Sequence, residues 1–332
     1  MATLETMKTK KGNYSIYQEN NQTFFLKELF SDIVPEIEGY NMIKFYYNVP
    51  KLISYDLIGK KILYEYNDGL KNRTLHQALF NDVDFDMNKM VQLLTFRFKD
   101  YEFKNENLSV NSKFFIGRIK EIINYLVLED DLFDLEIVVL GHELGIFRDV
   151  VKEVIAGISE NNIVPFVTSQ GDPTDLNIST DYMVSDFEVA GKNSIINEVA
   201  IFIGCYIVNC YYYYIKYMKS PHAKLTGTLL KYSDYVHCNY EIKDNKIYVD
   251  FKNIIPANVK KFILKYLEKV KSLGIINHDF NLGSYVALRF ISPVNLGEIE
   301  SREDKILLMA LCCLFQKKVK KLNQIIKFIK GL

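Results

Sequence analysis

The chain has no tryptophan, only 7 prolines and only 16 glycines among its 332 residues, and it has no excess of charge of either sign. It shows no internal repeat and no low-complexity linker. Lys plus Arg and Asp plus Glu both number 41. A balanced charge provides no whole-protein argument for binding nucleic acid or an anionic membrane surface, so we predict neither partner.

Metal-binding and secretory signatures are also missing. The five cysteines form no CxxC pair and the five histidines are scattered, so they predict no metal cluster. The cysteines stand in apolar runs, which favours reduced, buried thiols in a cytoplasmic protein. The first residues, MATLETMKTKKG, lack the apolar stretch of a signal peptide. The apolar segment from Val199 to Ile215 is shorter than the roughly 20 residues of a membrane span and contains Asn209, which favours a buried core helix.

What is present is an ordinary globular composition, 48% apolar and 25% charged, with the β-prone segments gathered at the front. A helix is predicted from about Pro35 to Tyr46, because proline suits the first turn and acidic residues follow it. Predicted strands cover Tyr14–Gln18, Thr23–Leu29, Val49–Leu57 and Lys61–Tyr66.

From about Thr74 onward the apolar residues recur at helical spacing. An alternating segment, Tyr240–Phe251, is typical of a β-hairpin. Predicted helices cover Met87–Phe98, Asn111–Leu128 and Leu144–Ser159, and one or two more cover Ile306–Ile329. The sequence therefore predicts an α+β protein with a β-rich N-terminal domain over residues 1–66 and a larger, mostly helical domain over residues 67–332.

The most informative segment is Pro165–Gly191, PFVTSQGDPTDLNISTDYMVSDFEVAG. An apolar run enters a loop with Asp172, reaches Asn177 five residues later, and leads through a short β-like pair to Asp186. Phosphoryl transfer needs an acceptor for the proton of the substrate hydroxyl and oxygen ligands that hold Mg²⁺ against the phosphates. An Asp, an Asn five residues on and an Asp before Phe supply these groups.

The strings QGDPTDLN and SDFEVAG resemble the HGDxxxxN and D-[FW]-E motifs of the aminoglycoside phosphotransferases and choline kinases. This resemblance implies a bilobal, protein-kinase-like fold. By it, Asp172 is the catalytic base, Asn177 is a Mg²⁺ ligand, and Asp186 is the principal one. Gln170 stands where the family usually has His, a position that mostly braces the loop by hydrogen bonds, which Gln can also make.

The front of the chain offers the matching nucleotide half. Lys27 ends a predicted strand and resembles the lysine that pairs with nucleotide phosphates and a helix glutamate, for which Glu36 is favoured over Glu38. Backbone groups of Glu65 and Tyr66 resemble the hinge that binds the base. The segment from Lys10 to Ser15 would be the phosphate-covering loop, with Gly12 and Ser15 near phosphate; a plain hairpin turn is the alternative.

We therefore expect a cytoplasmic phosphotransferase that uses ATP or GTP, Mg²⁺ and a small hydroxyl-bearing substrate. A kinase-like pseudoenzyme is the alternative, because Gln170 and the glycine-poor loop depart from the family. Substrate recognition is expected around residues 84–160 and in the C-terminal helices, but the sequence leaves the acceptor open among aminoglycosides, choline, sugars and amino alcohols. For a polycationic acceptor, the sequence offers an acidic set, with a solvated loop as the alternative: Glu129, Asp130, Asp131, Asp134 and Glu136.

Overall fold

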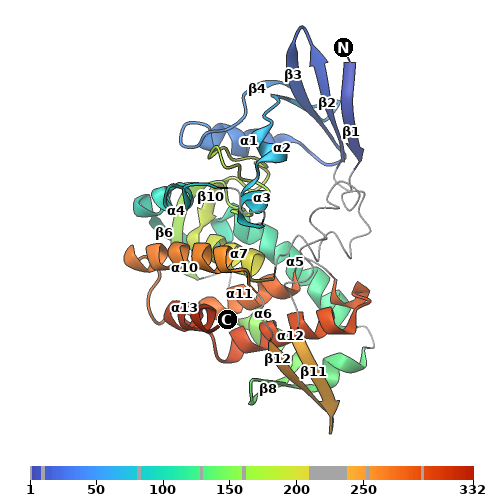
Figure 1. The fold of residues 1–332 in the computed structure, drawn as a ribbon, viewed down its shortest axis with the longest axis vertical. Coiled ribbons are helices and arrows are strands. Elements are labelled where there is room, and N and C mark those ends of the chain that lie inside the picture. Colours follow the sequence, from blue (N-terminus) through green and yellow to red (C-terminus); the bar gives the residue numbers. More distant parts are fainter. Residues whose placement is uncertain are drawn as a thin grey trace.

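The protein was analysed as a computed structural model, which describes residues 2–8, 12–80, 84–127, 130–158, 162–208, 238–251, 255–292 and 295–332. The N-terminal part is a five-stranded antiparallel sheet with the strand order β1-β2-β3-β5-β4 (Figure 1). Its strands are β1 (Ala2–Lys8), β2 (Gly12–Glu19), β3 (Gln22–Leu29), β4 (Leu52–Asp56) and β5 (Lys61–Glu65).

All four strands predicted in this region are confirmed, and β1 is an additional edge strand. The hairpin between β2 and β3 turns at Asn20 and Asn21, whose φ angles of 49° and 60° lie in the left-handed region that asparagine tolerates. Helix α1 (Val34–Ile43) follows β3 and carries its proline in the first turn. This is the predicted helix, ending three residues earlier than expected.

The remainder is mostly helical, as predicted (Figure 1). Its α-helices are α2 (Gly69–Asn72), α3 (Leu75–Phe80), α4 (Met87–Thr95), α5 (Val110–Leu126), α6 (Phe147–Gly157), α7 (Ile195–Val208), α10 (Ala257–Ser272), α11 (Leu282–Ile291), α12 (Arg302–Lys317) and α13 (Leu322–Gly331). Short 3₁₀ helices are η1 (Phe96–Asp100), η2 (Glu106–Leu108), η3 (Asp131–Asp134) and η5 (Leu296–Glu298).

Two small sheets accompany these helices. One has the order β10-β9-β6, and the other the order β11-β12-β7-β8. Their strands are β6 (Glu102–Asn105), β7 (Glu136–Val139), β8 (His142–Ile146), β9 (Ile163–Ser169), β10 (Gly191–Ser194), β11 (Cys238–Lys243) and β12 (Lys246–Phe251). The predicted hairpin over residues 240–251 is confirmed as β11 and β12.

The predicted helix over Leu144–Ser159 is wrong at its N-terminal end. Residues 142–146 form strand β8, which pairs with β7 through a turn at Leu140 and Gly141, where φ is 50° and 78°. The glycine supplies the left-handed conformation that this turn requires. Helix α6 therefore begins only at Phe147.

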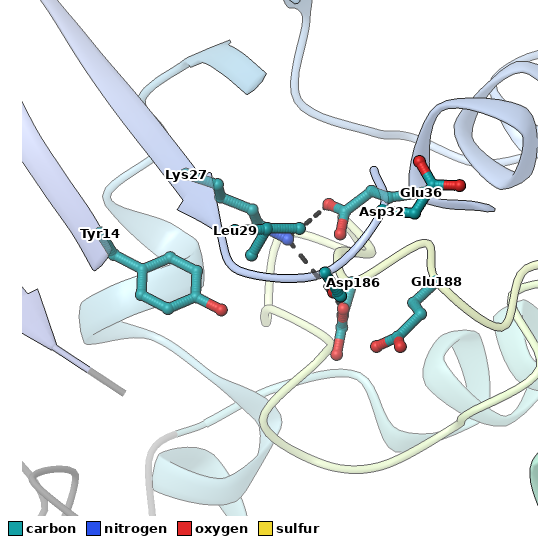
Figure 2. A pocket seen from close by; sticks show the side chains of 8 residues that line it. Tyr14, Lys27, Leu29, Asp32, Glu36, Asp186 and Glu188 are labelled. Atoms are coloured by element: carbon teal, nitrogen blue, oxygen red, sulfur yellow. Dashed lines mark hydrogen bonds and ion pairs between the residues drawn. The ribbon is translucent and has the colours of Figure 1, made fainter. Parts of the chain in front are cut away.

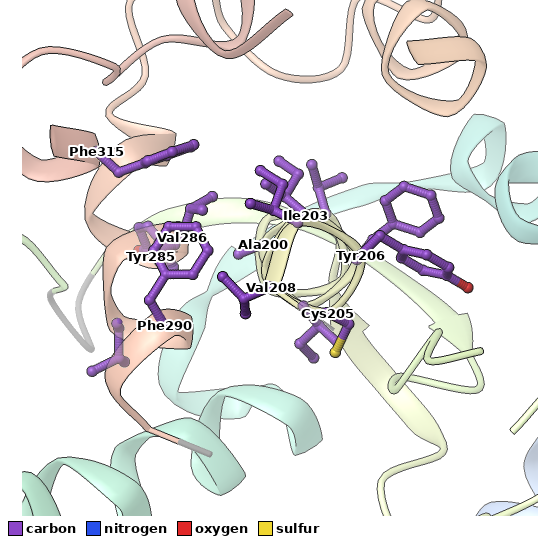
Figure 3. Close-up of a cluster of buried hydrophobic side chains, with 14 of the residues drawn as sticks. Ala200, Ile203, Cys205, Tyr206, Val208, Tyr285, Val286, Phe290 and Phe315 are labelled. Atoms are coloured by element: carbon purple, nitrogen blue, oxygen red, sulfur yellow. The ribbon is translucent and has the colours of Figure 1, made fainter. Parts of the chain in front are cut away.

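The core of the helical part forms around α7, whose residues are all buried. Figure 3 shows this helix end-on, with side chains of α11 and α12 on one side. Phe290 and Phe315 meet edge to face at 5.1 Å between ring centroids. The Val199–Ile215 segment is thus confirmed as a buried core helix up to Val208; the rest of it, including the Tyr211–Tyr214 run, lies outside the described residues.

Within the described parts of the chain, no helix has the length and apolarity needed to cross a membrane. The described cysteines, Cys205, Cys238, Cys312 and Cys313, are free and buried, as predicted. An α+β fold with an N-terminal antiparallel sheet and a later helical part is therefore established. The division into two domains at residue 66 stays a prediction.

Candidate active site

One ion-pair cluster joins three segments that are far apart in the sequence. The Lys27 ammonium on β3 lies 2.5 Å from the Glu36 carboxylate on α1 and 4.0 Å from the Asp186 carboxylate. Figure 2 shows the three side chains converging on a cavity of about 140 Å³. The structure thus brings together the Lys, the helix Glu and the second Asp of the predicted constellation.

Burial and charge set the state of this cluster. Burial lowers the pKa of Lys27, but the nearby carboxylates of Glu36 and Asp186 outweigh it, so the pKa is raised and the ammonium stays charged. The hydroxyl of Tyr64 on β5 donates to Glu36 at 3.2 Å. Burial and the charge of Glu36 raise the pKa of Tyr64, so it remains a donor. Glu36 therefore accepts from two directions and is held in place.

Asp186 occupies a left-handed turn, with φ of 57°, at the mouth of this cavity. The next residue, Phe187, is buried and packs edge to face on Tyr40 of α1 at 5.3 Å between ring centroids. Gly39 of α1 lies so close to this turn that an added Cβ would come within 2.0 Å of the Phe187 carbonyl oxygen. Helix α1 and the Asp186 turn are therefore locked against each other by backbone contact and by a buried ring.

Asp172 and Asn177 lie together on the loop that follows β9. The side-chain amide of Asn177 donates to the Asp172 carboxylate at 3.2 Å and to its backbone carbonyl at 3.3 Å. Asp172 is half-buried, whereas Asn177 is only 8% exposed. Because the Asn177 nitrogen faces Asp172, its amide oxygen remains as the group that can bind a cation.

Gln170 links this loop to the Asp186 turn. Its side-chain nitrogen donates to the carbonyl oxygens of Ser185 and Asp186 at 3.0 and 2.9 Å. Its side-chain oxygen accepts from the Asp172 N–H at 2.9 Å. The prediction that glutamine can brace the loop where the family has histidine is thus confirmed in its geometry.

The position before Asp172 requires glycine for steric reasons. Gly171 has φ of 83°, and an added Cβ would lie 2.3 Å from the Val189 carbonyl oxygen and 2.4 Å from the Asn193 amide nitrogen. Asn193 in turn donates to the carbonyl oxygens of Ser169 and Val189 at 3.2 and 2.9 Å. Only glycine allows this close approach of the Asp172 loop to the segment after Asp186.

A buried carboxyl lies behind the loop. Glu198 on α7 is 3% exposed and accepts a hydrogen bond from the hydroxyl of Ser169, the last residue of β9. Burial is the main cause that raises the pKa of Glu198 to about 8, and the charge of Asp172 adds to it. Sequence reasoning missed this residue, because a glutamate inside an apolar helix carries no signature of its partner.

The backbone N–H groups of the two predicted hinge residues already donate hydrogen bonds within the protein. The Glu65 N–H donates to the Lys51 carbonyl at 2.8 Å, and the Tyr66 N–H donates to the Thr23 carbonyl at 3.0 Å. A nucleotide base beside Glu65 and Tyr66 would therefore have to bind backbone carbonyl oxygens or residues further along the chain. The contact of Glu65 and Tyr66 with a nucleotide base stays a prediction, and these two N–H groups are already used.

Gly12 and Ser15 lie in strand β2, not in a loop, so the predicted loop over residues 10–15 is wrong at its C-terminal end. An added Cβ on Gly12 would come within 2.2 Å of the Glu28 carbonyl oxygen, so strand packing requires this glycine. Lys10 and Lys11 lie outside the described residues. The predicted phosphate contacts of Gly12 and Ser15 stay untested.

Besides Leu29 and Ser31, three further side chains line the cavity and were missed in the sequence. Tyr14 from β2, Asp32 from the β3–α1 connection and Glu188 face it together with Lys27 and Asp186 (Figure 2). For Glu188 a signal existed, because it follows Asp186 in the D-F-E string. The cavity thus holds four carboxylates, counting Glu36, around one ammonium, which suits a cation more than a bare anion.

No group of three His, Cys, Asp or Glu side chains in the described residues is arranged to hold a metal by itself. Mg²⁺ does not require one, since it is commonly bound by one or two carboxylates together with phosphate oxygens and water. Asp186, with 40% of its side chain exposed, and the amide oxygen of Asn177 are hard oxygen ligands of this kind. These residues fit a Mg²⁺ ion brought in with a nucleotide.

Three members of the acidic set proposed for a cationic acceptor form ion pairs. Asp130 pairs with Lys305 at 2.5 Å, Asp134 with Arg148 at 2.6 Å, and Glu136 with Lys246 at 2.9 Å. Glu129 lies outside the described residues. Strands β7 and β8 lie at the opposite end of the molecule from the N-terminal sheet (Figure 1). The structure therefore gives this set no role in an acceptor cleft next to Asp172.

Comparisons with known proteins give resemblance in structure alone. No family model and no curated protein matches the sequence. Among solved structures, the chain is similar to the choline kinase LicA of Streptococcus pneumoniae, with a TM-score of 0.37 and 12% identity over 87% of this chain and 91% of that one. It is similar to a choline/ethanolamine kinase family protein of Mesorhizobium loti, with a TM-score of 0.37 and 12% identity over 92% of each chain. At this level of identity the likeness concerns the fold alone.

Proposed function

We propose that this chain is a Mg²⁺-dependent phosphotransferase that moves the γ-phosphate of ATP or GTP to a hydroxyl of a small molecule. The observation that carries the proposal is the position of the Lys27 ammonium, 2.5 Å from Glu36 and 4.0 Å from Asp186. A buried lysine between a helix glutamate and an aspartate that faces a cavity is the arrangement that phosphoryl transfer uses to hold nucleotide phosphates. In this proposal the nucleotide lies between residues 1–66 and the remainder of the chain.

Each residue then has a defined role. Lys27 would neutralise phosphate charge, and Glu36 would keep its ammonium aimed at the cavity. The carboxylate of Asp172 would accept the proton of the substrate hydroxyl, in an orientation set by the Asn177 amide. Asp186 and Asn177 would hold Mg²⁺, which when bound neutralises charge on the phosphates. Catalysis would then consist of positioning and charge stabilisation.

Two variants test this mechanism. Asp172→Ala is expected to abolish phosphate transfer with the fold and nucleotide binding intact, because the proton acceptor is lost. Asp186→Ala is expected to abolish the Mg²⁺-dependent part of nucleotide binding. Asp181→Ala is the matched control, since Asp181 lies on the same loop but pairs with Arg73 at the surface. The measurements are thermal shift with ATP or GTP, with and without Mg²⁺, and transfer to a panel of choline, ethanolamine, aminoglycosides and sugars.

The outcomes separate the proposal from its rival. Near-wild-type transfer in Asp172→Ala or Asp186→Ala would contradict the mechanism. Nucleotide stabilisation of the wild type without transfer to any acceptor and without slow nucleotide hydrolysis would favour the pseudoenzyme, for which the sparse glycine loop is the motive. A wild type that no nucleotide stabilises under any condition would refute both.

A further inference from the structure

The segment after the hinge is paired along the catalytic loop. Backbone N–H groups of Leu75 and His76 donate to the carbonyl oxygens of Ile178 and Asp175 at 2.8 and 3.2 Å. In the other direction, the Thr180 N–H donates to the Arg73 carbonyl at 2.8 Å. Residues 73–76 and 175–180 are therefore joined by three backbone hydrogen bonds, which we call the clasp.

A buried side-chain pair lies at one end of the clasp. The Nδ1 of His76 lies 2.5 Å from the carboxylate of Asp175, and the two residues are 0% and 4% exposed. Since an ionised carboxylate only accepts, the imidazole donates this bond. A hydrogen bond to a charged group in a buried place is stronger than one between neutral groups, and removing one partner is costly. His76 thus holds Asp175 by its backbone and by its side chain at the same time.

Asp175 lies between the two groups assigned to chemistry. It is three residues after Asp172 and two before Asn177. Within the loop, the Thr174 N–H donates to the Asp172 carbonyl at 2.7 Å, and the Asn177 N–H donates to the Thr174 carbonyl at 3.1 Å. Because these hydrogen bonds connect the residues of the loop to one another, a displacement of Asp175 would also displace Asp172 and Asn177.

We propose that His76 is a positioning residue, which holds Asp172 and Asn177 in their working geometry through Asp175 and joins them to the segment after the hinge. This inference rests on the proposed function. His76 is the second residue of helix α3 and lies ten residues after Tyr66, so a nucleotide that orders the hinge would also order the catalytic loop through the clasp. A shift of about 1 Å in a catalytic group can reduce a rate about 100-fold.

Three variants test the role of the hydrogen bond. His76→Leu fills the site without a donor and is expected to lower kcat for nucleotide hydrolysis or transfer about 100-fold, with less than about threefold change in the KM of the nucleotide. His76→Asn keeps a donor near the Nδ1 position and is expected to retain kcat within about fivefold. Lys152→Gln removes an exposed 2.8 Å ion pair to Asp149 on α6, outside the clasp, and is expected to change neither constant.

A second measurement uses the wild type, in case His76→Leu does not fold. Hydrogen exchange with and without Mg²⁺ and nucleotide is expected to show that residues 73–76 and 172–181 gain protection together. Gained protection in one of the two segments alone would refute the clasp, as would wild-type kcat in folded His76→Leu. An equal loss in His76→Asn and His76→Leu would also refute the role of the hydrogen bond. If the wild type neither binds nor hydrolyses nucleotide, it is the proposed function that fails.

Discussion

Replacing Gln170 by leucine would remove the three hydrogen bonds that tie the catalytic loop to the Asp186 turn. The Asp172 N–H would lose its acceptor, and the carbonyl oxygens of Ser185 and Asp186 would lose their donor. Gln170 is 5% exposed, so water replaces these bonds poorly. At about 1 kcal/mol for each bond, the free energy of unfolding should fall by about 3 kcal/mol. Because both catalytic segments lose the same brace, the transfer or hydrolysis rate should also fall about 100-fold.

The matched variant is Gln170→His, which installs the residue usual in the resembling family. A neutral imidazole has one donor and one acceptor, so it can keep at most two of the three bonds. The expected loss is therefore about 1 kcal/mol, with activity retained. Urea unfolding followed by fluorescence or circular dichroism measures the stability of all three proteins. A leucine variant within about 0.5 kcal/mol of the wild type, or a histidine variant as damaged as the leucine variant, would refute the reasoning.

Two further predictions concern buried charge. Lys27→Met leaves the Glu36 carboxylate buried without its cation and should lower the free energy of unfolding in urea by about 3–5 kcal/mol. The Lys27→Met/Glu36→Gln double variant should recover part of this loss. A double variant no more stable than the single one would contradict this reasoning. The pKa of Glu198 is raised from 4.5 to about 8. Between these pH values the native state holds a proton that the unfolded state releases. The protonated carboxyl therefore contributes stability at low pH, and this contribution is lost as the pH rises. Glu198→Gln should therefore flatten the fall in unfolding free energy between about pH 4.5 and 8, whereas an unchanged slope would show that other groups cause it.

Short-range patterns account for the parts of the fold that the sequence predicts well. The β2–β3 and 240–251 hairpins join β-prone runs through polar turn residues, the helix after Lys27 has a proline and an acidic residue in its first turn, and all three are confirmed. Strand β8 was misread as helix because its five residues, HELGI, are too few to establish a period of two. Strand β1 is an exposed edge whose pairing with β2 depends on a neighbour that its own residues do not specify.

The candidate site likewise has features that the sequence predicts and features that it does not. The resemblance to the phosphotransferase motifs was enough to predict that Lys27, Glu36 and Asp186 meet, because it implies a fixed place for each in the order of elements. The hydrogen-bond partner of a backbone group could not be predicted: the N–H groups of Glu65 and Tyr66 donate to the carbonyl oxygens of Lys51 and Thr23, which lie elsewhere in the chain. Local sequence carries no record of such partners, since any residue can supply a carbonyl oxygen.

Buried polar residues gather around the loop that carries Asp172 and Asn177. The proposed phosphoryl transfer would require Asp172 and Asn177 to stay in place beside charged groups, and a loop cannot achieve this by its own backbone alone. Gln170, the first residue of the loop, ties it to the Asp186 turn; Asn193 on β10 holds the end of β9 that leads into it; and His76 binds it from helix α3. Each brace pays for burial of a polar group with a specific hydrogen bond, so these residues are poorly explained by packing. Hydrogen bonds from three parts of the chain therefore meet at this loop, and this is the support that its proposed catalytic role would require.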